Sequence, residues 1–397
     1  MPDVDALRKC FPALSRIHNN LPVAYFDGPG GTQVPRQVAE AMSDYLFHHN
    51  ANTHWDYPTS AETDAIITGA RESAAGFLNA HADEVSFGAN MTTITFHLAR
   101  ALGRTWQAGD EVIVTDLDHH ANVAPWRALE IDRGIIVRAA RTIRETCQVD
   151  MEHLARLVGK KTRLIAIGGA SNAVGTINDL ARAREIARSV GALFFVDAVH
   201  LAPHERMDVR AIGCDFLAVS AYKFYGPHLG ILFARHELLE SLPFPKLEPA
   251  PDCGPERAET GTQNQEGIAG VTATVDFMKS IGYRWLHERG EKFARMLWDG
   301  LRSIQRVRVY GPPPTQPRTP TVSFVIDGMT HDTVARALAE RALFVSHGDF
   351  YAATIVRDLA VDGLVRVGCA AYTTEEEIER LLRAVEEISD RSSQRAV

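Results

Sequence analysis

The sequence predicts an α/β fold in which a large domain with a mostly parallel sheet is joined to a small C-terminal α+β domain. Two observations carry this prediction. Between about residues 65 and 235, apolar runs of strand length alternate with stretches of helical periodicity. A shorter mixture of strand and helix patterns follows a proline-rich break at 311–320. Such alternation favours a parallel sheet with helices on both faces.

The alternating region contains six expected strands and the helices between them. The strands are expected at 85–87, 111–114, 164–167, 193–197, 216–220 and 231–234. One helix follows the turn at 88–90 and carries Ile94, Leu98 and Leu102 on one face. Another is capped by Asp179 and ended by Gly191. Ligands of such sheets bind at the carboxyl ends of the strands.

The smaller domain is expected after two proline-rich stretches. The first, 243–260, is expected to be an ordered loop, because helical pattern resumes near residue 267. After the second come a strand at 321–326, a helix at 332–341 and strands near Phe344 and Val365. A final helix is expected to open with Thr373 and Glu376 as a capping box. We place the large domain at 20–270 and the small domain at 1–19 and 271–397.

Composition excludes several classes of protein. The 397 residues are 45% hydrophobic and 23% charged, which is ordinary for a globular protein. A net charge of -8 argues against a nucleic-acid binder, and no apolar run approaches membrane-spanning length. The acidic N-terminus shows no signal peptide. Five scattered cysteines without metal-ligand spacing predict reduced thiols in a cytoplasmic protein and no metal site.

Lys223 and Asp197 are the most informative residues. Lys223 comes shortly after the buried run 216–219, and Asp197 closes the buried run 193–196. Desolvation lowers the cost of a neutral, nucleophilic amine. A lysine able to form a Schiff base and a carboxylate able to pair with a pyridinium nitrogen are the groups that pyridoxal phosphate requires. The pair therefore predicts a pyridoxal-phosphate site.

Other motifs are ambiguous when each is taken alone. Thr92, at a helix start, suits a phosphate donor or an ordinary helix cap. His119 suits a ring-stacking or proton-transfer group, or a solvated loop. Asn172 suits a donor to a phenolate or a substrate carboxylate, or a simple turn. His200 suits a donor to a phenolic oxygen, and Arg366 suits a carboxylate clamp or a surface arginine.

Together these motifs resemble the class V aminotransferase family of pyridoxal-phosphate enzymes, most closely its cysteine desulfurase and selenocysteine lyase branch. The resemblance covers nearly the whole chain and rests on 119–122 with 125–126, 171–172 with 175–178, Asp197, Ser220 with Lys223 and 225–227, 261–262, and Arg366. It implies the fold type I of pyridoxal-phosphate-dependent transferases. It also implies a homodimer with a shared active site.

The resemblance implies roles for individual residues. Lys223 carries the cofactor and shuttles the α-proton, Asp197 holds the pyridine nitrogen protonated, and His119 stacks on the ring. The phosphate and phenolic oxygen of the cofactor are held by Met91, Thr92, His200, Ser220 and Tyr222, with Thr262 reaching across from the second subunit. The substrate is held by Asn172 and Arg366, and His54 is a further candidate for substrate binding, as are Trp55, Phe350 and Tyr351.

Three departures from the family pattern bear on the reaction. Tyr222 stands where the desulfurases commonly have histidine, and His200 stands where they have glutamine. Their nucleophilic cysteine lies about fifteen residues before the arginine, where this chain reads His-Gly-Asp-Phe-Tyr-Ala at 347–352. Cys369 points away from the face of Arg366 by strand alternation and suits a packed hydrophobe, whereas Cys253 lies in the proline-rich loop.

We therefore expect an enzyme acting on an amino acid, in which a carbon–sulfur (or similar Cβ–X) bond is cleaved by elimination through an aldimine and a quinonoid. An aminotransferase or an amino-acid epimerase is the alternative. A non-catalytic cofactor-binding scaffold is the alternative of another class, and retention of Lys223 argues against it. A dinucleotide-binding oxidoreductase is disfavoured because no G-x-G-x-x-G stands between the first strand and helix.

Overall fold

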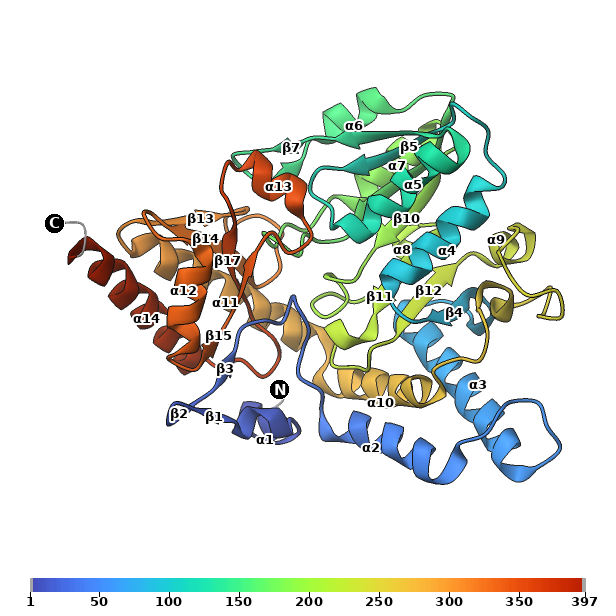
Figure 1. Cartoon of the computed structure of the whole chain (residues 1–397), viewed down its shortest axis with the longest axis horizontal. Helices are drawn as coiled ribbons and strands as arrows, with labels where there is room; N and C mark the ends of the chain where they lie inside the picture. Colours follow the sequence, from blue (N-terminus) through green and yellow to red (C-terminus); the bar gives the residue numbers. More distant parts are fainter. Residues whose placement is uncertain (1–2, 395–397) are drawn as a thin grey trace.

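The structure, a computed structural model, describes residues 3–394 of the chain. Its larger part is built on a seven-stranded sheet with the strand order β4-β12-β11-β10-β9-β5-β6 (Figure 1). The strands are β4 (Val85–Gly88), β5 (Glu111–Thr115), β6 (Ile136–Ala140), β9 (Thr162–Gly168), β10 (Leu193–Asp197), β11 (Phe216–Ser220) and β12 (Gly230–Ala234). All six expected strands of this region are present, and β6 is one that the sequence patterns missed.

The sheet is mainly parallel, as expected. Five neighbouring strands run parallel to one another: β11, β10, β9, β5 and β6. In contrast, β12 runs antiparallel to both of its neighbours, β11 and β4. The reversal follows from chain length. Only residues 221–229 join β11 to β12, which is too short for the helical crossover that a parallel connection needs.

Two hydrophobic cores cover the two faces of this sheet. Along β10, Phe194 and Val196 pack in the core that holds α3 (Pro58–Leu78), α7 (Leu180–Ser189) and α10 (Gln265–Ile281). Phe195, between them, packs in the core of α4 (Met91–Gly103) and α5 (Ala124–Arg133). Because successive side chains alternate, Asp197 and Ser220 lie on the face that α4 covers.

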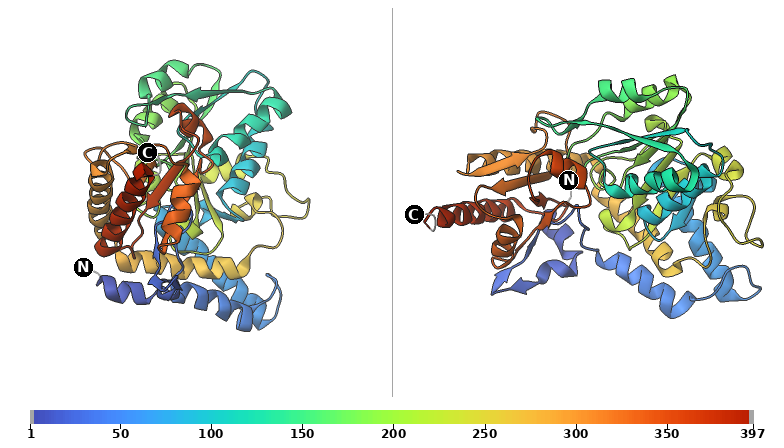
Figure 2. Two further views of the ribbon diagram at one scale, coloured as in Figure 1. Left: turned by 60° about the vertical axis from the view of Figure 1, so that its left-hand side comes forward. Right: turned by 45° about the horizontal axis from the view of Figure 1, so that its top comes forward.

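The smaller part contains an antiparallel four-stranded sheet in the order β13-β14-β17-β16. Its strands are β13 (Val307–Tyr310), β14 (Thr321–Ile326), β16 (Ser346–Gly348) and β17 (Leu364–Gly368). The helices α11 (Tyr283–Ser303), α12 (His331–Ala339) and α14 (Glu375–Gln394) pack against it, and α14 lies on the side away from the larger sheet (Figures 1 and 2). This arrangement matches the expected α+β domain.

The predicted capping box of the last helix is wrong by one residue. Thr374 and Glu377 form it: the Glu377 N–H donates to Thr374 Oγ at 3.2 Å, and the Thr374 N–H donates to the Glu377 carboxylate at 3.0 Å. Thr373 is fully buried and its hydroxyl accepts the Ala370 N–H at 3.0 Å instead. The hydroxyl of Thr373 is therefore used in the turn after β17, and the hydroxyl of Thr374 caps the helix.

The remaining elements are short, apart from α2. They are α1 (Val4–Lys9), β1 (Ile17–His18), β2 (Leu21–Pro22), β3 (Ala24–Tyr25), α2 (Arg36–Asp44), a π-helical turn (Tyr45–His49), β7 (Thr142–Ile143), β8 (Gln148–Val149), α6 (Met151–Leu157), α8 (Val209–Ile212), α9 (His236–Ser241), β15 (Leu343–Phe344) and α13 (Ala353–Asp358), with short 3-10 turns at Pro12–Ser15, Ala82–Glu84, His120–Asn122, Ala221–Lys223 and Pro255–Ala258.

The packing near the expected domain boundaries mixes the two parts. β3 pairs in parallel with β15, so residues 24–25 join the smaller part, whereas α10 packs on α2 and α3 along its whole length. The boundaries 20–270 and 271–397 stay a prediction, and residues 1–2 and 395–397 lie outside the described part of the chain. Within residues 3–394, no helix combines the length and the apolar character needed to cross a membrane.

Candidate active site at the carboxyl edge of the larger sheet

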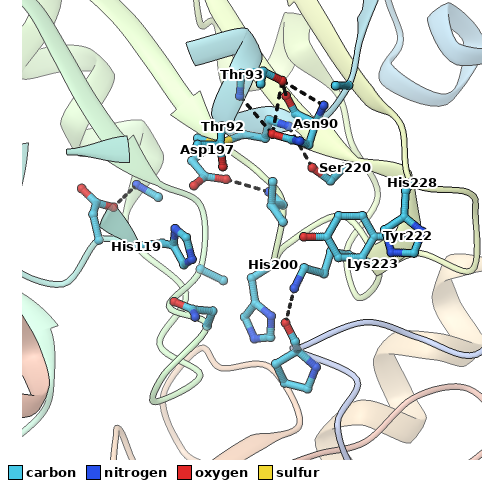
Figure 3. Close-up of a pocket in the computed structure, with 18 residues that line it drawn as sticks. Asn90, Thr92, Thr93, His119, Asp197, His200, Ser220, Tyr222, Lys223 and His228 are labelled. Carbon is cyan, nitrogen blue, oxygen red and sulfur yellow. Dashed lines mark hydrogen bonds between the residues drawn. The ribbon is translucent and has the colours of Figure 1, made fainter. Parts of the chain in front are cut away.

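A cavity of about 560 Å³ lies at the carboxyl ends of β10 and β11, beside the first turn of α4 (Figure 3). Nine of the residues singled out from the sequence line it: Met91, Thr92, His119, Asn172, Asp197, His200, Ser220, Tyr222 and Lys223. The cavity therefore gathers side chains from the connections that follow five different strands of the sheet. Such an edge is the usual ligand site of an open α/β sheet.

Lys223 ends the short turn that follows β11 and reaches toward the chain at 29–30. Its ammonium donates to the Pro29 and Gly30 carbonyls at 2.6 and 2.9 Å and lies 4.8 Å from the centre of the Tyr222 ring. Burial, together with the positive charge of Arg366, lowers the pKa of Lys223 to about 8. A substantial fraction of the amine is then neutral and nucleophilic in mildly alkaline solution.

Two buried carboxyl groups lie at the same edge. Asp197 closes β10 and accepts the Val199 N–H at 3.0 Å, and burial raises its pKa to about 6. Asp118 accepts the Gly168 N–H at 2.5 Å and both the N–H and the hydroxyl of Thr115. Burial raises the pKa of Asp118 to about 7, and the charge of Asp197 adds to this rise. A cation bound between them would stabilise the ionised form of both.

Two of the three histidines that line the cavity, His119 and His200, are held neutral. Burial and the nearby charge of Lys223 lower the pKa of His119 to about 4. Its Nδ1 accepts the Ala121 N–H at 3.0 Å, which places the single proton of the neutral ring on Nε2. Burial also lowers the pKa of His200 well below its usual value. Nε2 of His200 lies 3.1 and 3.2 Å from the hydroxyls of Thr319 and Thr321 on the smaller part.

The first turn of α4 lines one side of the cavity. The Asn90 side chain caps the helix by accepting the Thr93 N–H at 3.0 Å, and the Met91 N–H donates to Ser220 Oγ at 3.0 Å. Thr92 lies exposed on this turn and faces the cavity (Figure 3). The positive end of the helix dipole lies here and favours an anion such as a phosphate.

Arg366 lies next to the cavity rather than on its wall. It is 3% exposed on β17 and donates to Ser346 Oγ, to the Asn172 carbonyl and to Asp27 at 3.0, 3.0 and 3.2 Å. These bonds use three of the five N–H groups of a guanidinium. The Asn172 side chain donates to the Phe350 carbonyl at 2.9 Å, and its buried Oδ1 has no partner among the described residues.

Two of the expected site residues, Thr262 and His54, lie elsewhere in the single chain, and so do Cys253 and Cys369. Thr262 lines a neighbouring cavity of about 370 Å³ between β4, α4 and the loop after residue 258. The side chain of His54 is 81% exposed, and its ring lies 3.1 Å from Asp64, outside the cavity. Cys253 is exposed and Cys369 is buried in the core of the smaller part, so neither thiol reaches the cavity.

Four polar residues that line the cavity were not singled out from the sequence: Asn90, Thr93, Asp118 and His228. Asn90 and Asp118 stand beside the motifs already singled out, so their places next to Met91 and His119 were a usable signal. His228 gave no signal beyond following a Gly-Pro turn. Its ring stacks on that of Tyr222, with the centroids 4.8 Å apart and the planes 17° apart.

The donor set suits pyridoxal phosphate. Lys223 offers the amine that an aldehyde requires, Asp197 offers a carboxylate for a ring nitrogen, and the first turn of α4 offers donors for a phosphate. The unpartnered Oδ1 of Asn172 is a buried polar atom that lacks the hydrogen bond such atoms normally make. Among residues 3–394, no group of three or more potential metal ligands is found.

Comparisons with known proteins identify the family. The family model described as aminotransferase class-V matches residues 24–381. A probable cysteine desulfurase of Vibrio cholerae is 29% identical over 98% of this chain and 99% of its own length, and one of Xylella fastidiosa is 31% identical over 97% and 95%. The structure of a cysteine desulfurase from Thermococcus onnurineus superposes with a TM-score of 0.92, at 27% identity, over 98% of this chain and 99% of that chain. The chain belongs to the aminotransferase class-V family and is a pyridoxal-phosphate-dependent enzyme.

Proposed function

We propose that this enzyme is a lyase that cleaves the carbon–sulfur, or a similar Cβ–X, bond of an amino acid related to cysteine. Two observations together support this proposal. Lys223 lines the cavity, and the loop before Arg366 carries Phe350 and Tyr351 but no cysteine. The curated relatives named cysteine desulfurase support a cysteine-like substrate. Elimination requires a leaving group on the β-carbon but no protein thiol.

The residues around the cavity would divide the work between binding and proton transfer. Bound pyridoxal phosphate supplies the electron sink that lets the α-carbon lose its proton. Lys223, with its lowered pKa, takes that proton and returns it to the departing sulfur. Arg366 has two N–H groups left to hold the substrate carboxylate, and the neutral ring of His119 covers one side of the cavity.

We also propose that the working unit is a homodimer in the cytoplasm. Thr262 lies outside the cavity of its own chain, which leaves it available to a second copy. The apolar side chains of Phe47 and Trp55 are 78% and 63% exposed, which is unusual for such residues and favours a covered surface. All five cysteines are free thiols, which supports a reducing compartment.

The test of the proposal is a product assay. Purified holoenzyme is incubated with cysteine, S-substituted cysteines and plain amino acids, and thiol or sulfide, pyruvate and ammonia are measured. We expect these products in equal amounts from the sulfur amino acids. Transfer of the amino group to an added keto acid, or racemisation, with no thiol or ammonia released would refute the lyase and favour an aminotransferase or an epimerase.

A matched pair of lysine variants tests whether Lys223 is the residue that carries the cofactor and catalyses the reaction. Lys223→Ala should lose the visible absorption of the cofactor and all product formation. Lys279→Ala removes a surface lysine whose side chain is 62% exposed and should change neither. A Lys223→Ala protein with unchanged turnover would refute the assignment of Lys223.

A further inference from the structure

The loop between β16 and α13 holds two aromatic residues in an unfavourable backbone conformation. Phe350 and Tyr351 have φ angles of 55° and 57°, in the left-handed region. For bulky L-residues this conformation costs about 1–2 kcal/mol each, and it persists only where surrounding contacts enforce it. We call residues 349–351 the aromatic loop. The strain marks it as a segment whose shape serves a purpose at the site.

Hydrogen bonds tie the aromatic loop to the cavity through its backbone. The Phe350 carbonyl accepts from the Asn172 side chain at 2.9 Å, and the Tyr351 carbonyl accepts the His120 N–H at 2.7 Å. The Asp349 carboxylate accepts the Tyr351 N–H at 3.0 Å and so closes the turn. The loop is therefore held in place by the same segments that carry Asn172 and His119.

The two aromatic rings lie against two residues of the site. The Phe350 ring lies beneath the Arg366 guanidinium, 4.2 Å from its centroid to the central carbon. The Tyr351 ring lies 5.6 Å from the His119 ring, centroid to centroid. Yet Tyr351 is 73% exposed, and its neighbour His119 lines the cavity. An exposed aromatic ring fixed in this way is a stacking surface for something that enters the site.

We propose that the aromatic loop selects S-substituted cysteines whose substituent is aromatic or otherwise bulky and apolar. This inference rests on the proposed lyase function. With the substrate carboxylate at Arg366 and its α-carbon near Lys223, the sulfur substituent extends toward the loop, which lies beside Arg366 and His119. The Asp349 carboxylate at the base of the loop disfavours an anionic substituent.

The reaction balances without an oxidant. The Cα–H bond breaks and Lys223 takes the proton, the Cβ–S bond breaks with its electron pair leaving on sulfur, and the proton returns to give a free thiol. The other product, 2-aminoacrylate, tautomerises and is hydrolysed by water to pyruvate and ammonia. No protein thiol takes part, in agreement with the sequence between Cys253 and Cys369, which contains no cysteine.

The test compares four substrates on the holoenzyme: cysteine, S-methylcysteine, S-benzylcysteine and S-carboxymethylcysteine. We expect the highest kcat/KM for S-benzylcysteine and the lowest for the anionic S-carboxymethylcysteine. In Tyr351→Ala the ratio of kcat/KM for S-benzylcysteine to that for S-methylcysteine should fall by roughly 2- to 10-fold, the effect of one aromatic contact. Tyr351→Phe keeps the ring and should keep the ratio.

The outcomes separate this inference from the proposed function. Equal kcat/KM values for the benzyl, methyl and carboxymethyl compounds, or an unchanged ratio in Tyr351→Ala, would overturn the role of the aromatic loop while the lyase stands. Should the enzyme transfer amino groups instead, the lyase fails. The preference for S-benzylcysteine over S-methylcysteine is then measured as a ratio of apparent dissociation constants. Each constant is the substrate concentration that half-saturates the change in cofactor absorbance, and the effect of Tyr351→Ala on this ratio tests the loop directly. The wild-type substrate series decides the matter even if Tyr351→Ala does not fold.

Discussion

Replacing Arg71 with methionine tests how the loop before Thr262 is held. Arg71 lies on α3 and is 6% exposed, and it donates to the Val85 carbonyl and to Glu259 at 2.6 and 2.8 Å. Glu259, 8% exposed, also accepts the Phe87 N–H at 2.8 Å. This ion pair therefore fixes residue 259, three positions before Thr262, to β4.

The expected loss of stability is large because one charge would remain buried. Removing one partner of a buried pair typically costs about 3–5 kcal/mol. Arg71→Met leaves the Glu259 carboxylate without its cation, so we expect a loss of that size in the free energy of unfolding. Arg71→Met combined with Glu259→Gln replaces the buried charge with an amide and should recover more than half of the loss.

The loss should also depend on pH. Burial already raises the pKa of Glu259, and removal of Arg71 raises it further. The folded variant then binds a proton that the unfolded chain releases, so its stability falls as pH rises above the unfolded pKa of about 4.3. The deficit relative to wild type should therefore be smaller at pH 5 than at pH 8.

The assay is equilibrium unfolding in urea, followed by circular dichroism and tryptophan fluorescence at both pH values. Arg284→Met is the matched control, because Arg284 pairs with Glu288 on the surface with its side chain 92% exposed, and we expect no measurable loss. An Arg71→Met protein within about 1 kcal/mol of wild type, or a deficit equal at pH 5 and pH 8, would refute the reasoning.

Three further predictions concern the cavity. The pKa of Asp118 in the folded protein is about 7, so this group stabilises the fold at low pH and the contribution is lost as the pH rises toward 7. Asp118→Asn should flatten this part of the curve of unfolding free energy, measured in urea, against pH. An unchanged curve would contradict the assignment. The rate at which apoprotein takes up pyridoxal phosphate should rise with pH through about 8, because only neutral Lys223 attacks, and Arg366→Gln should move that midpoint upward; a midpoint above 10 would contradict it. Arg366→Lys should raise KM by roughly 10- to 100-fold for every substrate, as expected for a lost charged hydrogen bond, and a normal KM would exclude it from carboxylate binding.

Local patterns predicted the elements that carry the chemistry. The strands ending at Asp197 and Ser220 have the bounds expected from their apolar runs, because a strand buried on both faces is apolar at every position. The capping box was misplaced because Thr373 and Thr374 are equivalent in local pattern. Which of the two hydroxyls is free depends on the Ala370 N–H, and the turn after β17 positions that group.

Residue roles that depend on distant partners were not predictable in the same way. The sequence placed His200 near a phenolic oxygen, but the structure shows its Nε2 between Thr319 and Thr321 of the smaller part. It also suggested His54 as a substrate-binding residue, and His54 lies outside the cavity. Thr262 was expected to reach the site of a second subunit; it lies outside the cavity of its own chain, and its role stays a prediction. A pattern of residue types identifies candidates but does not show which hydrogen bonds they already make.

The sequence by itself determined the family, the parallel sheet and the positions of Lys223 and Asp197 at strand ends, because strand burial and period are local properties of the chain. Only the tertiary structure decided what surrounds them. It placed the strained Tyr351 beside His119, the Phe350 ring beneath Arg366, and Arg366 in contact with Asp27. Each of these contacts joins segments from different elements, and close tertiary packing, rather than any local preference, brings them together.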